Sequence, residues 1–179
     1  MLKKYKIKIT FIGLIITISI FGANYSNKTN HSTKEIPKIN SEEYYKVVKV
    51  LDGDTFDILI DNNKIRVRML GIDTPEIKDK RKTVQCFAKN ASEKTKELIL
   101  NNEVRLLTDI SQGILDKYNR VLAYVYTEDG ILINSYLISN GYAHEYTYRI
   151  TYEKQIEFKK LETEARINKQ GLWGDICNT

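Results

Sequence analysis

Apolar and polar residues alternate along two neighbouring segments in the first half of the chain, residues 56–60 and 65–70. A period of two residues is typical of β-strands with one buried face, and both segments are rich in β-branched side chains. Between them lies Asp61-Asn62-Asn63. Asp and Asn tolerate the left-handed backbone angles of a tight turn. The pattern therefore predicts an antiparallel hairpin.

The other elements follow from the same periodicities. A helical spacing of apolar residues predicts a first helix that begins at Thr83 or Asn90 and ends at Asn101. Two more helices are predicted over residues 132–140 and 153–170, and a Gly follows each of them. Five short strands with interspersed helices indicate an α+β domain, and a closed or nearly closed barrel would bury them without exposed edges. The three strands outside the hairpin are predicted over residues 44–51, 103–108 and 121–126.

The first 43 residues differ in composition from the rest. Four Lys residues precede an apolar run over residues 9–23, as in an export signal. Residues 24–43 are rich in Asn, Ser, Thr and Lys and have too little apolar content to fold. The sequence predicts a signal peptide or membrane anchor over residues 1–23, a flexible linker over 24–43 and one domain over 44–179. We expect export, with the protein either secreted or tethered to the outer face of the cytoplasmic membrane.

The charge of the chain is concentrated in this N-terminal part. The whole chain carries a net charge of +5, with 28 basic and 23 acidic residues. Residues 1–43 hold seven Lys and three Glu, so the remaining domain has a net charge of +1. The net charge is therefore no sign of nucleic-acid binding, and any polyanion must be bound by locally placed Arg and Lys.

Acidic residues gather at both ends of the predicted hairpin. Asp52 and Asp54 precede its first strand, while Asp73 and Glu76 follow its second strand, which also carries Arg68. Folding of the hairpin brings these acids together. Carboxylates that lie close together repel one another, so they stay ionised only if a cation or a basic group lies among them.

An all-oxygen site of this kind suits calcium or magnesium better than zinc. Pro75 lacks an N–H group and favours an extended backbone at Thr74, which leaves the Thr74 carbonyl free to bind a metal. Arg120 stands directly before a predicted strand, in the run Asp116-Lys117-Tyr118-Asn119-Arg120. A planar guanidinium binds phosphate with two hydrogen bonds, so Arg68 and Arg120 together are candidates to hold a phosphate opposite the metal.

Four motifs follow one another along most of the predicted domain, from residue 46 to residue 173. They are Asp52-Gly53-Asp54-Thr55, Arg68 with Asp73-Thr74-Pro75-Glu76, residues 117–126 and Gly171-Leu172-Trp173. Their order and spacing resemble the staphylococcal nuclease (thermonuclease) family. The resemblance implies an OB-fold five-stranded β-barrel with three helices that hydrolyses phosphodiester bonds in DNA and RNA with one Ca2+. We expect a monomer.

The resemblance also implies roles for individual residues. Asp54, Asp73 and the Thr74 carbonyl would be calcium ligands, with Asp52 and Thr55 supporting them. Arg68 and Arg120 would hold the scissile phosphate, and Glu76 would orient or deprotonate the attacking water. Asn119 stands where the family usually has Gly, and Asn tolerates positive φ better than most residues, so we expect the turn to persist. The residues placed against nucleotides would be Lys117, Tyr118, Tyr146 and Tyr148.

Two alternatives to a nuclease make different demands on the sequence. A non-catalytic OB-fold nucleic-acid-binding domain would be expected to lack Arg68, Glu76 or Arg120, and the chain has all three. A structural or adhesive surface domain would leave the acid cluster unexplained. The two cysteines, Cys86 and Cys177, allow either a disulfide, which export would permit, or two free thiols.

Overall fold

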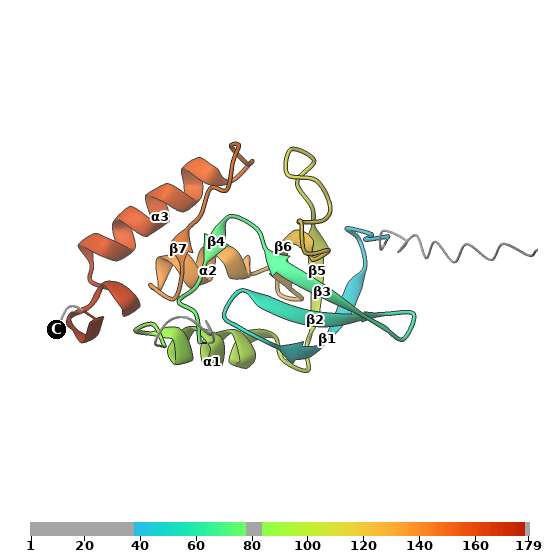
Figure 1. Ribbon diagram of the computed structural model, residues 1–179, viewed down its shortest axis with the longest axis horizontal. Helices are drawn as coiled ribbons and strands as arrows, with labels where there is room; N and C mark the ends of the chain where they lie inside the picture. The colour runs from blue at the N-terminus through green and yellow to red at the C-terminus, as the bar shows by residue number, and fades with distance from the viewer. Residues whose placement is uncertain (1–37, 78–83, 178–179) are drawn as a thin grey trace, which may run out of the picture. The chain divides into compact units, whose positions relative to one another are not determined.

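Five strands form a closed barrel in the computed structural model, which describes residues 38–77 and 84–177 (Figure 1). The order around the barrel is β1-β2-β3-β6-β5, and every neighbouring pair is antiparallel except β3 and β6, which are parallel. The barrel strands are β1 (Tyr44–Val50), β2 (Thr55–Ile60), β3 (Asn63–Met69), β5 (Glu103–Leu107) and β6 (Val121–Thr127). The helices are α1 (Ala88–Ile99), α2 (Ile133–Ser139) and α3 (Gln155–Ile167). The predicted five-stranded OB-type barrel with three helices is confirmed.

The predicted hairpin is formed by β2 and β3. Asp61 and Asn62 have φ of 49° and 62°, so a two-residue turn in the left-handed region joins the strands. Its register pairs Ile60 with Asn63 and, at the other end, Thr55 with Arg68. This pairing places the segment that contains Asp52 and Asp54 beside the base of Arg68.

The barrel interior is filled by the inward-facing residues of all five strands. These side chains are fully or almost fully buried, and they include Val47, Phe56, Ile58, Val67, Met69, Leu106 and Val125. Burial alternates along much of β1, β3 and β5, as the sequence pattern predicts, whereas β2 and β6 also have consecutive buried residues. Figure 1 shows the helices outside the barrel, with α2 and α3 packed against each other.

Four short elements were not predicted. β4 (Ile72–Asp73) pairs with β7 (His144–Glu145) in a separate two-stranded sheet. Two short 3₁₀ helices, η1 (Gly171–Trp173) and η2 (Asp175–Cys177), follow α3. Helix α1 begins at Ala88, between the two predicted starting points, because Phe87 adopts a left-handed φ of 69° and turns the chain into the helix.

A disulfide joins Cys86, just before α1, to Cys177 in η2, with Cα atoms 5.7 Å apart. The alternative of two free thiols is therefore excluded. The predicted signal or anchor segment, residues 1–23, lies outside the described residues, and so do most of the predicted linker and residues 78–83. Within the described part of the chain, no helix is long and apolar enough to span a membrane.

Candidate active site

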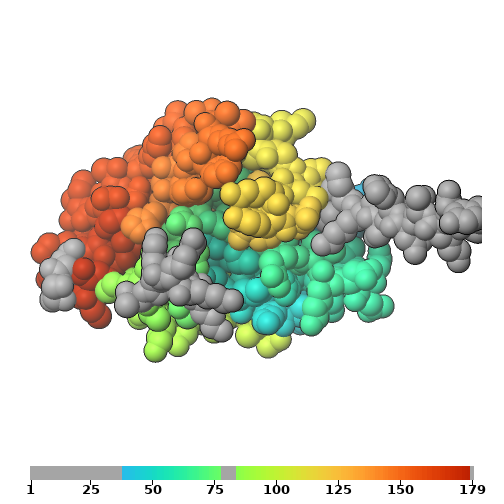
Figure 2. All heavy atoms as spheres, in the orientation of Figure 1, coloured from blue at the N-terminus to red at the C-terminus, as the bar shows by residue number. Residues whose placement is uncertain are grey.

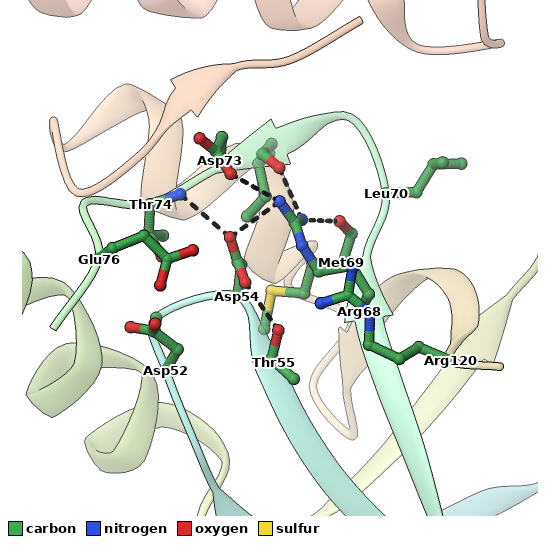
Figure 3. A network of polar contacts seen from close by, with 12 residues as sticks. Asp52, Asp54, Thr55, Arg68, Met69, Leu70, Asp73, Thr74, Glu76 and Arg120 are labelled. Carbon is green, nitrogen blue, oxygen red and sulfur yellow. Dashed lines mark hydrogen bonds and ion pairs between the residues drawn. The ribbon is translucent and has the colours of Figure 1, made fainter. Parts of the chain in front are cut away.

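Arg68 is the centre of the acid cluster. Its Nη2 lies 3.0 Å from Asp54 Oδ2 and 2.8 Å from Asp73 Oδ1, so one guanidinium bridges two carboxylates (Figure 3). Its Nη1 donates to the carbonyls of Met69 and Ile72 at 2.6 and 2.7 Å. The Arg68 side chain is almost buried, so these contacts are shielded from water and fix its direction. The expected convergence of Asp54, Arg68 and Asp73 is confirmed.

Asp54 is held through both carboxylate oxygens. Its Oδ1 accepts the Thr55 hydroxyl at 2.9 Å, and its Oδ2 accepts the Thr74 N–H at 3.1 Å. The turn before Asp54 is held by helix α1, because the Thr95 hydroxyl donates a hydrogen bond to the Gly53 carbonyl at 2.6 Å. Buried and bonded in this way, Asp54 has one orientation, which is what a preorganised metal ligand requires.

The carboxyl groups of the other two acids, Asp52 and Glu76, face each other (Figure 3). Burial, the neighbouring Asp52 and the charges of Asp54 and Asp73 raise the pKa of Glu76 to about 7. Burial, reinforced by Asp54 and opposed by Arg68, also raises the pKa of Asp73. The single positive charge of Arg68 therefore does not neutralise the carboxylates of this cluster, and the site has an excess of negative charge.

This donor set fits a hard cation. Asp54, Asp73 and the Thr74 carbonyl offer only oxygen, the ligand that calcium and magnesium prefer. The Thr74 hydroxyl is another oxygen at this place, buried and without a hydrogen-bond partner among the described residues. Across residues 38–77 and 84–177, no group of three or more His, Cys, Asp and Glu side chains is arranged to hold a metal. The candidate ligands are two carboxylates and one carbonyl, so an ion at this place depends on the main chain for its third protein ligand.

Arg120 approaches the cluster from the loop before β6. Its Nε donates to Asp116 Oδ2 at 2.7 Å, and Asp116 Oδ1 accepts the N–H groups of Tyr118 and Arg120 at 2.9 Å each. Asn119 adopts a φ of 61° in this turn, which confirms the expectation that the turn persists with Asn in place of Gly. In Figure 3 the Arg120 side chain points toward Arg68 and Asp54. Asp116 thus closes the turn and orients the guanidinium.

The four residues expected to contact nucleotides lie together on an exposed surface. The Lys117 ammonium is 5.0 Å from the Tyr118 ring centroid and 5.9 Å from that of Tyr148. The rings of Tyr146 and Tyr148 are 6.4 Å apart. All three Tyr side chains are exposed, so a ligand can reach them. Aromatic faces beside cations are typical of surfaces that stack nucleotide bases.

Two loops that are distant in sequence build this surface. The Ser111 hydroxyl and the Gln112 side-chain amide both donate to the Thr151 carbonyl, at 3.4 and 3.0 Å. Asp109 Oδ2 accepts the Glu153 N–H at 2.8 Å. Burial alone would raise the pKa of Asp109, but its hydrogen bonds from Glu153, Ser111 and Tyr124 lower it, so it stays ionised. Figure 2 shows the yellow spheres after β5 lying against the orange spheres after β7.

Three residues contribute contacts to the site, although the sequence had indicated no role for them. Thr95 fixes the Gly53 carbonyl, Asp116 orients Arg120, and Gln85 binds the main chain of Glu76. A buried Thr on the apolar face of a helix is a signal that could have indicated Thr95. The contact of Gln85 joins residues nine positions apart through irregular chain, and no periodicity indicates it.

Comparison with known protein families adds evidence independent of this geometry. The family model of the staphylococcal nuclease homologues matches residues 66–175, which is more than half of the chain. The chain belongs to the staphylococcal nuclease family. The predicted family membership is confirmed, and the matched region of this nuclease homologue contains Arg68, Asp73, Glu76 and Arg120, while Asp54 precedes it.

Individual relatives of this nuclease homologue give the same result. It is 33% identical over 172 residues to a thermonuclease of Staphylococcus intermedius, covering 96% of this chain and 99% of that protein. It is 35% identical over 135 residues to a thermonuclease of Staphylococcus hyicus, covering 75% and 78%. It is 30% identical over 197 aligned positions to the endonuclease YncB of Bacillus subtilis, covering 96% and 92%.

Proposed function

We propose that this protein is a calcium-dependent nuclease that hydrolyses phosphodiester bonds in DNA and RNA. The observation that carries the proposal is the convergence of Asp54, Asp73, Glu76, Arg68 and Arg120 from separate segments at one end of the barrel (Figure 3). The names of the relatives, thermonuclease and endonuclease, support the nuclease activity. Calcium dependence and the roles of the individual residues are inferred from the chemistry of the site.

Asp54, Asp73 and the Thr74 carbonyl would hold the ion. Asp52 and Thr55 support these ligands. The Thr55 hydroxyl donates a hydrogen bond to Asp54, and the Asp52 carboxylate accepts one from the Gly53 N–H at 2.8 Å. Bound calcium would supply positive charge that neutralises the phosphate and stabilises the additional charge of the transition state. The excess of negative charge in the metal-free cluster supports such an occupant.

The two arginines differ in how free they are to bind a phosphate. Arg68 already uses both Nη atoms on protein oxygens. Arg120 donates a hydrogen bond through its Nε to Asp116. None of the described residues accepts a hydrogen bond from its Nη atoms. The Arg120 Nη pair is therefore available for two parallel hydrogen bonds to phosphate oxygens. Arg68 would add charge on the other side while keeping Asp54 and Asp73 in place.

Glu76 is placed to handle the proton of the attacking water. Its carboxyl group lies beside the proposed ion, within the cluster of acids (Figure 3). The pKa of about 7 belongs to the metal-free cluster, and a bound calcium ion would lower it and keep the carboxylate ionised, as a general base requires. Lys117, Tyr118, Tyr146 and Tyr148 would bind the nucleotides on either side of the scissile phosphate.

A digestion assay tests this proposal. Purified protein is incubated with single- and double-stranded DNA and RNA, with calcium or with a chelator, and products are followed on gels. We expect cleavage of both nucleic acids with calcium and none with chelator. Binding without cleavage under all conditions would instead favour the non-catalytic OB-fold nucleic-acid-binding domain.

We also propose that the protein is exported, with the Lys-rich start and the apolar run of residues 9–23 as the signal. The Cys86–Cys177 disulfide supports this, because disulfides persist in oxidising compartments. N-terminal sequencing of the protein from culture medium and from membranes separates cleavage of the signal from retention as an anchor. Recovery of the full-length chain from the cytoplasm alone would contradict export.

A further inference from the structure

Glu76 lies in irregular chain directly after Pro75, so no helix or strand fixes its main chain. Its N–H donates to Gln85 Oε1 at 2.8 Å, and its carbonyl accepts the Gln85 N–H at 3.2 Å. Among the described residues these are the only hydrogen bonds of the Glu76 main chain. One residue therefore fixes both polar groups of the backbone from which this carboxylate projects.

Gln85 is itself anchored on its other side. The next residue, Cys86, is joined by the disulfide to Cys177. Phe87 turns the chain into α1, and its ring packs 5.5 Å from that of Tyr142. The Gln85 carbonyl accepts the Ala88 N–H at 3.2 Å. Gln85 thus links Glu76 to the start of a helix that the disulfide ties to the C-terminal η2.

We propose that Gln85 is a positioning residue for Glu76, and that the Cys86–Cys177 disulfide keeps Gln85 in place. The inference rests on the proposed function, since it deepens the role given there to Glu76. A carboxylate that takes a proton must lie within hydrogen-bond reach of the water, and a displacement of about 1 Å can reduce the rate by on the order of 10²-fold. The calcium ligands are held by other contacts, so loss of Gln85 affects turnover rather than calcium binding.

Two substitutions of Gln85 separate the bond from the shape of the side chain. Gln85→Met keeps the length but removes the acceptor of the Glu76 N–H, and Gln85→Glu retains an acceptor oxygen. We expect Gln85→Met to lower kcat by about tenfold, with KM and the calcium Kd within about twofold of wild type. Gln85→Glu should restore kcat to within about threefold. Gln170→Met, at an exposed position away from the site, is the matched control and should leave all three values unchanged.

The disulfide is tested by reduction, because Cys86 is exposed and a reductant can reach it. Reduced wild-type protein should lose about three- to tenfold in kcat and recover it on reoxidation. Cys177→Ser should show the lower kcat with and without reductant. In the Gln85→Met background, reduction should have little further effect, because both changes act through the same contact. Near-UV circular dichroism checks that each protein is folded.

Three results would overturn the inference. The first is a Gln85→Met enzyme with wild-type kcat. The second is a loss of kcat that occurs only together with an equal loss of calcium affinity, which would indicate a general collapse of the site. The third is a folded, reduced wild-type enzyme with unchanged kcat. Failure of the proposed function is distinguishable, because the oxidised wild-type protein itself would then not cut nucleic acid with calcium.

Discussion

Replacing Arg120 by Ala is expected to lower kcat by on the order of 10²-fold or more, because it removes a preorganised donor that stabilises phosphate charge in the transition state. Calcium affinity should stay close to that of the wild type, since Arg120 bonds Asp116 and not Asp54 or Asp73. Turnover of a short oligonucleotide and calcium binding measured on the same preparation check this. Arg120→Lys should recover only part of the rate, since Lys cannot bind phosphate through a planar fork.

Arg105→Ala is a suitable control, because Arg105 lies on β5 and packs 4.8 Å from the Tyr126 ring, outside the acid cluster. It should keep wild-type turnover. Arg68→Ala is a less informative test, because Arg68 bridges Asp54 and Asp73 and its loss leaves a buried carboxylate unpaired. An Arg120→Ala protein with calcium bound and full turnover would show that Arg120 does not bind the reacting phosphate.

Replacing Glu76 by Gln is the second change with a large expected effect. Gln retains the size of the side chain, but it cannot accept a proton. If Glu76 is the general base, kcat should fall by about 10²-fold or more, within the range that such groups contribute. KM should change little, since the base acts in the chemical step. Initial rates at saturating calcium and substrate measure the effect.

The matched control is Glu97→Gln on α1, where the carboxylate is exposed and bonded to Lys94. It should leave kcat unchanged. If Glu76→Gln kept wild-type kcat with calcium bound, then water would be activated without Glu76, and the inference about Gln85 would lose its basis.

The positions of Asp54, Arg68 and Asp73 were predictable because the hairpin depends on local signals. A two-residue period and the turn residues Asp61 and Asn62 specify both strands and their register, and the register brings the acids together. The same holds for Asn119, whose tolerance of positive φ follows from its side chain alone.

The elements that were missed depend on tertiary contacts. β4 and β7 have two residues each, too few for any period, and they pair across about seventy residues of chain. The start of α1 is set by Phe87, a residue that rarely adopts positive φ and is held there by its neighbours. The bonds from Gln85 to Glu76 and from Thr95 to Gly53 exist only once the barrel and α1 are assembled.

A calcium titration of turnover, run beside calcium binding in the same buffer, tests the central claim most directly. We expect no hydrolysis in chelator and a rise of turnover that follows the binding curve of the wild-type protein. Asp54→Asn, which removes one charged ligand, should shift both curves to at least about tenfold higher calcium. Full hydrolysis in chelator, or an Asp54→Asn protein whose two curves match those of the wild type, would contradict a calcium-dependent nuclease with its ion at Asp54.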